Sequence, residues 1–163
     1  MERHRQQGMT TVEFAIVANV VIVLMLALME LGRAYFVFAA LEEVTRRGAR
    51  LAAVCPVSDP AIRTAAVFNG PGDNSGSRFI PELTPGNIAV EYLDRNSNLV
   101  LDPADPAEFI AIRFVRVRVV GFQHRMLIPF VAGIANLDMP EFSTVLPRES
   151  LGVPREGAVT PCG

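Results

Sequence analysis

With 163 residues, the chain has room for about one domain and an appendage, which excludes an enzyme built of two lobes. Apolar residues make up 50% of the chain and concentrate toward its N-terminus, while the remainder has the composition of an ordinary soluble domain. The formal net charge of −2 comes without the basic face that nucleic-acid binding requires, so DNA and RNA are excluded as partners.

Residues 1–8 form a short leader that is predicted to stay in the cytoplasm. Arg3, Arg5 and the amino terminus outweigh Glu2, and this balance favours the cytoplasmic side by the positive-inside rule. The apolar run that follows ends without the small-residue cleavage site of a secretory signal peptide. The sequence therefore predicts a single-pass protein whose C-terminal part lies outside the cytoplasm.

A long helix is predicted over residues 9–54, with a membrane span at about 14–30 and an amphipathic part after it. The apolar run rises about 24 Å, less than the roughly 30 Å of a hydrocarbon core, so the helix is expected to continue beyond it. There, apolar positions recur at helical spacing with charged residues on the other faces. Cys55-Pro56 ends the pattern.

Glu13 lies at the edge of the apolar run, and two interpretations account for it. In the first, Thr10 and Glu13 form a capping box at the start of the helix. In the second, a carboxylate that enters lipid costs about 2.5–3.5 kcal/mol and therefore has a partner. A cut after Gly8 would create that partner, because the new amino group of Met9 can neutralise Glu13 of a neighbouring helix.

Residues 55–146 are predicted to form an extracytoplasmic α+β domain. A short helix is expected at 58–68, with Asp59 as its cap and Pro60 at its first position, followed by a loop at 69–77. Strands are expected at 88–93, 99–101, 109–122 and 143–146. The predicted fold class is α+β: one long N-terminal helix packed on a small antiparallel sheet.

The predicted strand at 109–122 changes phase. Its large apolar residues recur at even positions from 110 to 114 and at odd positions from 115 to 119. A bulge near Phe114-Val115 would return them to one face. Arg116 and Arg118 then lie on the outer face, either as a solvated surface or as a docking surface for an acidic partner.

Oxygen-bearing side chains recur between residues 94 and 102, at Asp94, Asn96, Asn98 and Asp102. Their spacing is similar to that of a calcium loop, but Leu99 replaces the glycine that such a loop needs at its sixth position, and Asp105 replaces the glutamate at its twelfth. A hairpin turn between two strands is favoured, with calcium binding as the alternative. No other cofactor is expected.

Residues 147–163 contain three prolines and are predicted to form an extended tail, held at its end only if Cys162 pairs. Cys55 and Cys162 belong to no metal-binding pattern. Outside the cytoplasm they would form a disulfide that closes a loop of 107 residues, and two free thiols are the alternative.

The sequence predicts a protein that is not an enzyme. His124 is the only histidine beyond the leader, and no nucleophile, zinc or phosphate-loop motif is present. A carboxylate pair is the remaining route to catalysis, drawn from Glu91, Asp94, Asp102 and Glu108. Acidic residues near a turn are usually surface charge, so an anchored hydrolase is the least favoured function.

Gly8 followed by MTTVEF and an apolar helix resembles the prepilin peptidase site of type IV pilin-like proteins. The longer stretch GMTTVEFAIVANVVIVLMLALMELGRAYFVFAALEEVTRRGARLAAV is similar to the opening of the TadE-like family of the tight-adherence (Tad) pilus system. It shares the VEFA start, the ELGR after the span and the R-x-GAR-x-A close. Two later stretches, VRVRVVGF and TVLPRESLG, are similar more loosely.

The resemblance implies a minor pilin or pseudopilin of the bacterial inner membrane, with its C-terminal domain in the periplasm or outside the cell. It implies a cut between Gly8 and Met9 by a prepilin peptidase, and a role for Glu13 in assembly. The implied partners are other pilin-like subunits, contacted through the helix, and the Tad secretion machinery. An uncleaved membrane-anchored protein with a structural or adhesive role is the alternative.

Overall fold

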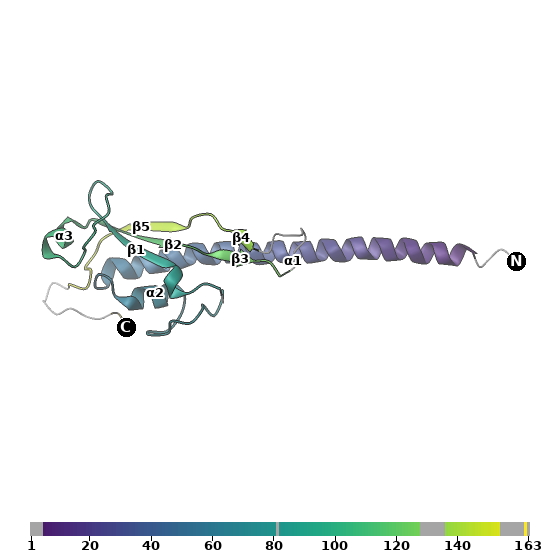
Figure 1. The fold of residues 1–163 in the computed structure, drawn as a ribbon, viewed down its shortest axis with the longest axis horizontal. Helices are drawn as coiled ribbons and strands as arrows, with labels where there is room; N and C mark the ends of the chain where they lie inside the picture. The colour runs from purple at the N-terminus through teal and green to yellow at the C-terminus, as the bar shows by residue number, and fades with distance from the viewer. Residues whose placement is uncertain (1–4, 81, 128–135, 154–161, 163) are drawn as a thin grey trace. The chain divides into compact units, whose positions relative to one another are not determined.

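The computed structural model of the chain describes residues 5–80, 82–127, 136–153 and 162. Two compact units divide the chain. We call Met1–Phe36 with Arg125–Leu137 the anchor unit, and Val37–His124 with Asp138–Gly163 the sheet unit. The elements, in chain order, are α1 (Arg5–Val54), α2 (Pro60–Ala66), η1 (Pro85–Asn87), β1 (Ile88–Leu93), α3 (Pro106–Ala111), β2 (Phe114–Val119), β3 (Gln123–Arg125), β4 (Asn136–Asp138) and β5 (Ser143–Pro147) (Figure 1).

The long helix α1 contributes to both units, and its second part packs on a small antiparallel sheet (Figure 1). This arrangement confirms the predicted α+β class. Within the described residues, the core of the sheet unit joins one face of α1 to the apolar side chains of the strands. Its fully buried members include Leu41, Val44, Ala49, Ala52, Ile88, Val115 and Val117. Gly48 lets the helix approach the sheet closely, because a Cβ at this position would lie 3.0 Å from Val117 Cγ1.

The sheet of three strands has the order β1-β2-β5, with both pairs antiparallel. Alternation along β2 places its valines in the core and its arginines on the outer face, as expected for a strand with one solvated side. β1 coincides with the strand predicted at 88–93, and β5 extends the one predicted at 143–146 by a single residue. The strands β3 and β4 pair separately.

One predicted strand is wrong, and another is longer than the strand in the structure. Residues 99–101 make only an isolated bridge, between Leu99 and Leu93. The strand predicted at 109–122 begins as α3, and β2 starts only at Phe114. The change of phase is therefore a change from helix to strand, and β2 pairs with β1 in unbroken register, without the predicted bulge.

The C-terminus of α1 is capped by a segment from the far end of the chain. The backbone N–H groups of Glu149 and Leu151 donate hydrogen bonds to the carbonyl of Ala53. The backbone N–H of Gly152 and the hydroxyl of Ser150 donate to the carbonyl of Val54. All four bonds are 2.7–3.3 Å long. These contacts satisfy carbonyls that a helix end leaves unbonded. The predicted tail thus begins with a docked segment, in which Leu151 is 2% exposed, and residues 154–161 and 163 lie outside the described residues.

Candidate functional site

The backbone of Gly8 and Met9 belongs to α1, and the Glu13 side chain is exposed on the surface of that helix. Because α1 begins at Arg5, Glu13 lies about two turns inside it rather than at its first turn. The capping-box interpretation is therefore wrong, since Thr10 does not precede the helix. Val12 and Phe14, on either side of Glu13, are 59% and 75% exposed. A carboxylate thus lies within an exposed apolar surface.

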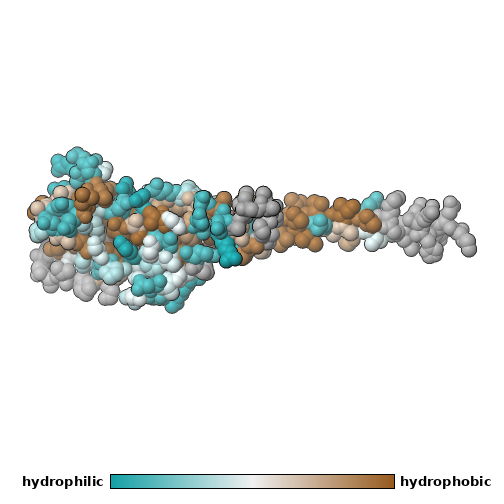
Figure 2. Space-filling view, in the orientation of Figure 1, coloured by the Kyte–Doolittle hydropathy of each residue, from teal (hydrophilic) through white to brown (hydrophobic). Residues whose placement is uncertain are grey.

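That surface continues along the helix. The exposed large apolar side chains include Ile16, Val17, Val20, Val21, Leu24, Met25, Leu28, Met29 and Leu31. Figure 2 shows apolar residues along this part of α1. Among the described residues, Thr10–Val54 is a helix long and apolar enough to cross a membrane. Exposure of an apolar surface of this length to water is unfavourable. A membrane or a bundle of helices would remove it from water.

A polar cluster lies where the apolar run ends. Glu30 is 3% exposed, and its Oε1 lies 3.5 Å from Nη2 of Arg33. The same oxygen accepts a hydrogen bond of 3.2 Å from the backbone N–H of Leu127, and the Arg33 guanidinium donates to the carbonyl of Arg125. Residues 125–127 are thereby bound to α1. We call them the strap.

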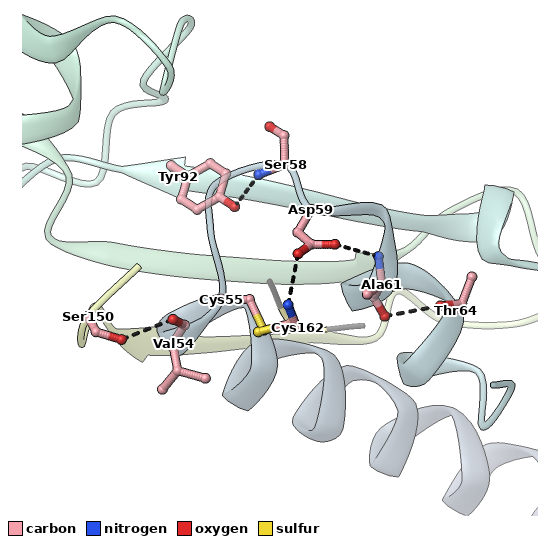
Figure 3. The surroundings of a disulfide bond; sticks show 9 residues. All are labelled: Val54, Cys55, Ser58, Asp59, Ala61, Thr64, Tyr92, Ser150 and Cys162. Carbon is pink, nitrogen blue, oxygen red and sulfur yellow. Dashed lines mark hydrogen bonds between the residues drawn. A yellow bond between two sulfur atoms is a disulfide. The ribbon is translucent and has the colours of Figure 1, made fainter. Parts of the chain in front are cut away.

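At the other end of α1, the sulfur atoms of Cys55 and Cys162 are bonded, with their Cα atoms 5.7 Å apart (Figure 3). Asp59 connects the two neighbouring segments, because one of its oxygens accepts from the N–H of Ala61 at the start of α2 and the other from the N–H of Cys162, at 2.9 and 3.3 Å. The predicted cap of α2 therefore also binds the end of the chain.

The arginines of the outer sheet face are paired with acidic residues. Glu91 accepts hydrogen bonds from Nε of Arg116 and Arg118, at 2.6 and 3.0 Å, and Arg118 also bonds Glu141 at 3.0 Å. Two positive charges thus meet two negative ones. Because Arg116 and Arg118 are paired in this way, they favour a solvated surface over a docking surface for an acidic partner.

Burial of Glu91 acts to raise its pKa, but the hydrogen bonds and charges of Arg118 and Arg116 outweigh it, so the pKa lies below its ordinary value. A lowered pKa stabilises the fold at pH values above the unfolded pKa, and this contribution is lost as the pH falls through the folded pKa.

We expect Glu91→Gln to lower the free energy of unfolding at pH 7 by about 1–3 kcal/mol, because two partly buried arginines lose a charged acceptor. The variant should also lose less stability than the native chain on acidification below about pH 4. Urea unfolding in detergent micelles across this pH range measures both effects. Glu82→Gln, at an exposed glutamate of the same unit, is the control, and equal losses in the two variants would contradict the prediction.

Residues 94–98 form a turn between β1 and the isolated bridge at Leu99. Asp94 Oδ1 accepts from the N–H groups of Asn96 and Asn98, and its Oδ2 accepts from the Asn98 amide, at 2.7–3.0 Å. These hydrogen bonds hold the pKa of Asp94 below its ordinary value. In the part of the chain that the structure describes, no three His, Cys, Asp or Glu residues form a metal-binding group. Calcium binding through Asp94, Asn96, Asn98 and Asp102 stays a prediction.

The carboxylates that were considered for catalysis have separate structural partners. Glu108 accepts from the backbone N–H of Asp102 at 2.8 Å, and Asp102 in turn accepts from that of Ala104 at 3.2 Å. Glu91 bonds the arginines of β2, and Asp94 its own turn. Each acidic group is thus engaged locally.

Comparison with known proteins adds one match. Residues 8–50 match the model of the family described as TadE-like protein. The match begins at Gly8, includes Glu13, Glu30 and Gly48, and confirms the predicted resemblance over that range. No curated protein and no solved structure matches the chain.

The family that this model describes is a structural family associated with the Tad pilus. The match ends at Arg50, and the looser similarity of VRVRVVGF and TVLPRESLG lies beyond it. Within the TadE-like segment, sequence reasoning missed the pairing of Glu30 with Arg33 and the strap. A buried glutamate at the end of an apolar run was the available signal, because such a charge requires partners.

Proposed function

We propose that this chain is a membrane-anchored, pilin-like TadE-like subunit that assists assembly of a Tad/Flp-type adhesion pilus after a prepilin peptidase cuts behind Gly8. The observation that carries the proposal is Glu13, an exposed carboxylate within the apolar surface of a TadE-like helix. The chain acts by assembly with other pilin-like subunits rather than by catalysis.

The cut supplies the charge that Glu13 requires. Cleavage removes the leader and leaves a positive amino group on Met9, four residues from Glu13. When two such helices pack in lipid, the amino group of one neutralises the carboxylate of the other, and the cost of each buried charge falls. An uncut chain has no amino terminus at this level, so processing and assembly are coupled.

The disulfide supports a location of the sheet unit outside the cytoplasm. Disulfides persist in the periplasm and outside the cell, whereas cytoplasmic thiols are kept reduced. The basic leader favours the cytoplasmic side for the N-terminus. Together they support a single pass through the bacterial inner membrane, with the leader accessible to the peptidase and the sheet unit periplasmic.

We expect complete loss of processing in a Gly8→Leu variant. The full chain is co-expressed with a prepilin peptidase, and the mass of the purified product identifies its N-terminus. The native chain should begin at Met9 and the variant at its original first residue. Gly32→Leu is the matched control, because this glycine of the same helix lies well beyond the cut. A native chain left intact where a control prepilin is cut would favour the uncleaved structural protein instead.

Glu13→Gln tests the charge pairing separately, because it removes the charge and retains the size of the side chain. In cells with the complete pilus machinery, we expect the variant to be cut but to support few or no pili, counted by electron microscopy. Glu42→Gln, at an exposed glutamate in the second part of α1, should leave pilus number unchanged. Normal pili on Glu13→Gln cells would refute the pairing while leaving the cleavage intact.

A further inference from the structure

The strap is held to α1 through its own backbone. Both hydrogen bonds from α1 reach main-chain atoms, the Leu127 N–H and the Arg125 carbonyl, so they fix the position of the strap whatever side chains it carries. Each also involves a charged group, Glu30 or Arg33, and charge-assisted hydrogen bonds are the stronger kind. The side chain of Leu127 is therefore held close to residue 30 of the helix.

The apolar side chains at this level are directed outward. Leu127 is 65% exposed, although Glu30, to which its N–H donates, is only 3% exposed. On α1, Leu28 and Leu31 are 68% and 67% exposed, and they lie within about one helical turn of Glu30. Leu137, at the other end of this segment of the anchor unit, is 44% exposed. None of residues 128–135 between the two leucines is charged.

One residue of the strap is charged. Arg125 is exposed, lies two residues before Leu127 and is the last residue of β3, in which Gln123 is also exposed. A transition from arginine to exposed leucine within two residues is typical of a chain at a membrane surface, where the cation meets phosphate groups and the apolar side chain enters the acyl region.

We infer that the strap is a second membrane contact, in which Leu127 enters the boundary between headgroups and acyl chains beside the end of the α1 span. The occupant is a lipid surface, because exposed Leu127 is held near exposed Leu28 and Leu31 and adds to the apolar surface of the span itself. The pair formed by buried Glu30 and partly exposed Arg33 fixes the depth of this contact. The inference rests on the proposed membrane anchoring of α1 and adds to it a second, loop-borne contact.

Tryptophan fluorescence tests the inference directly, because the chain contains no tryptophan. Three single substitutions are compared in full-length protein reconstituted into phosphatidylethanolamine and phosphatidylglycerol vesicles, with and without brominated acyl chains. Leu24→Trp reports the span, Leu127→Trp the strap, and Leu101→Trp, at a position 83% exposed in the sheet unit, reports a residue that faces water. An intact Cys55–Cys162 disulfide, seen by mass spectrometry, verifies that each variant is folded.

We expect bromine to quench Leu24→Trp and Leu127→Trp by about twofold or more and to leave Leu101→Trp unchanged. Quenching of Leu24→Trp without quenching of Leu127→Trp overturns the inference and leaves the anchor in place. In that case, a blue-shifted Leu127→Trp emission assigns the strap to a protein contact, and a water-like emission assigns it to solvent. Absence of quenching at both positions overturns the proposed anchoring as well.

Discussion

Replacement of Cys162 by serine is expected to lower the free energy of unfolding of the sheet unit by about 2–5 kcal/mol. The disulfide closes a loop of 107 residues, and a loop of about this length confines the unfolded chain enough to account for roughly 4.7 kcal/mol in the entropic model. Because Cys162 also donates its N–H to Asp59, release of the chain end removes a contact at the start of α2 as well.

The measurement is guanidinium unfolding of the full chain in detergent micelles, followed by tyrosine fluorescence. Tyr92 reports the sheet unit because it is 3% exposed. A reductant should shift the native midpoint to that of the variant and leave the variant itself unchanged. The double variant Cys55→Ser/Cys162→Ser separates loss of the bond from effects of a free thiol. Equal midpoints for the native chain and the double variant would show that the disulfide contributes nothing.

The second large effect is expected at Gly48, where Gly48→Leu should destabilise the sheet unit by about 1–3 kcal/mol or more. A glycine inside a helix costs about 1 kcal/mol relative to alanine, so its presence here requires a reason. The reason is close approach, because a Cβ would lie 3.0 Å from Val117 Cγ1 and 3.2 Å from the Cβ of Ala66. A leucine has to separate α1 from β2 and α2.

Gly32 supplies the matched control on the same helix, since a Cβ there would meet no atom within 4 Å. Gly32→Leu should leave the unfolding midpoint of the sheet unit unchanged in the same assay, whereas Gly48→Leu should lower it. The unfolding midpoint of Gly48→Ala should lie between those of the native chain and Gly48→Leu, because the gain in helix propensity partly offsets the cost of the tight contacts. A Gly48→Leu variant with native stability would mean that the helix is not held against the sheet at this point.

Local patterns in the sequence were sufficient for much of the fold. The helix up to Val54 follows from apolar periodicity and from the Cys55-Pro56 stop, and β1 and β5 from short apolar runs between turn residues. The error over 109–111 was avoidable, because Asp105-Pro106 repeats the Asp-Pro signal that identified α2 at Asp59. The alternation of apolar and charged residues that begins at Phe114 made the whole of 109–122 resemble a strand and concealed this helix-start signal.

The remaining features depend on residues that are distant in the sequence. Nothing near Glu30 indicates that Leu127 supplies its hydrogen bond, and nothing near Glu91 indicates that β2 places two arginines around it. At the candidate site, Glu13 and Gly8 were identified from local sequence, but the start of α1 at Arg5 was not, because the polar leader carries no cap signal. Pairing between distant segments is set by the packed fold rather than by local preference.

The segment at 149–152 determines when the sheet unit can become complete. It supplies the last hydrogen bonds of α1, and Gly152 lies so close to Pro56 that a Cβ would come within 2.7 Å of the Pro56 backbone. The strand β5, immediately before it, completes the sheet. Contacts between sequence positions this far apart form late and slowly. The sheet unit therefore becomes complete only after residues 149–152 have been synthesised, and a chain truncated before them retains the helix without its completed partner.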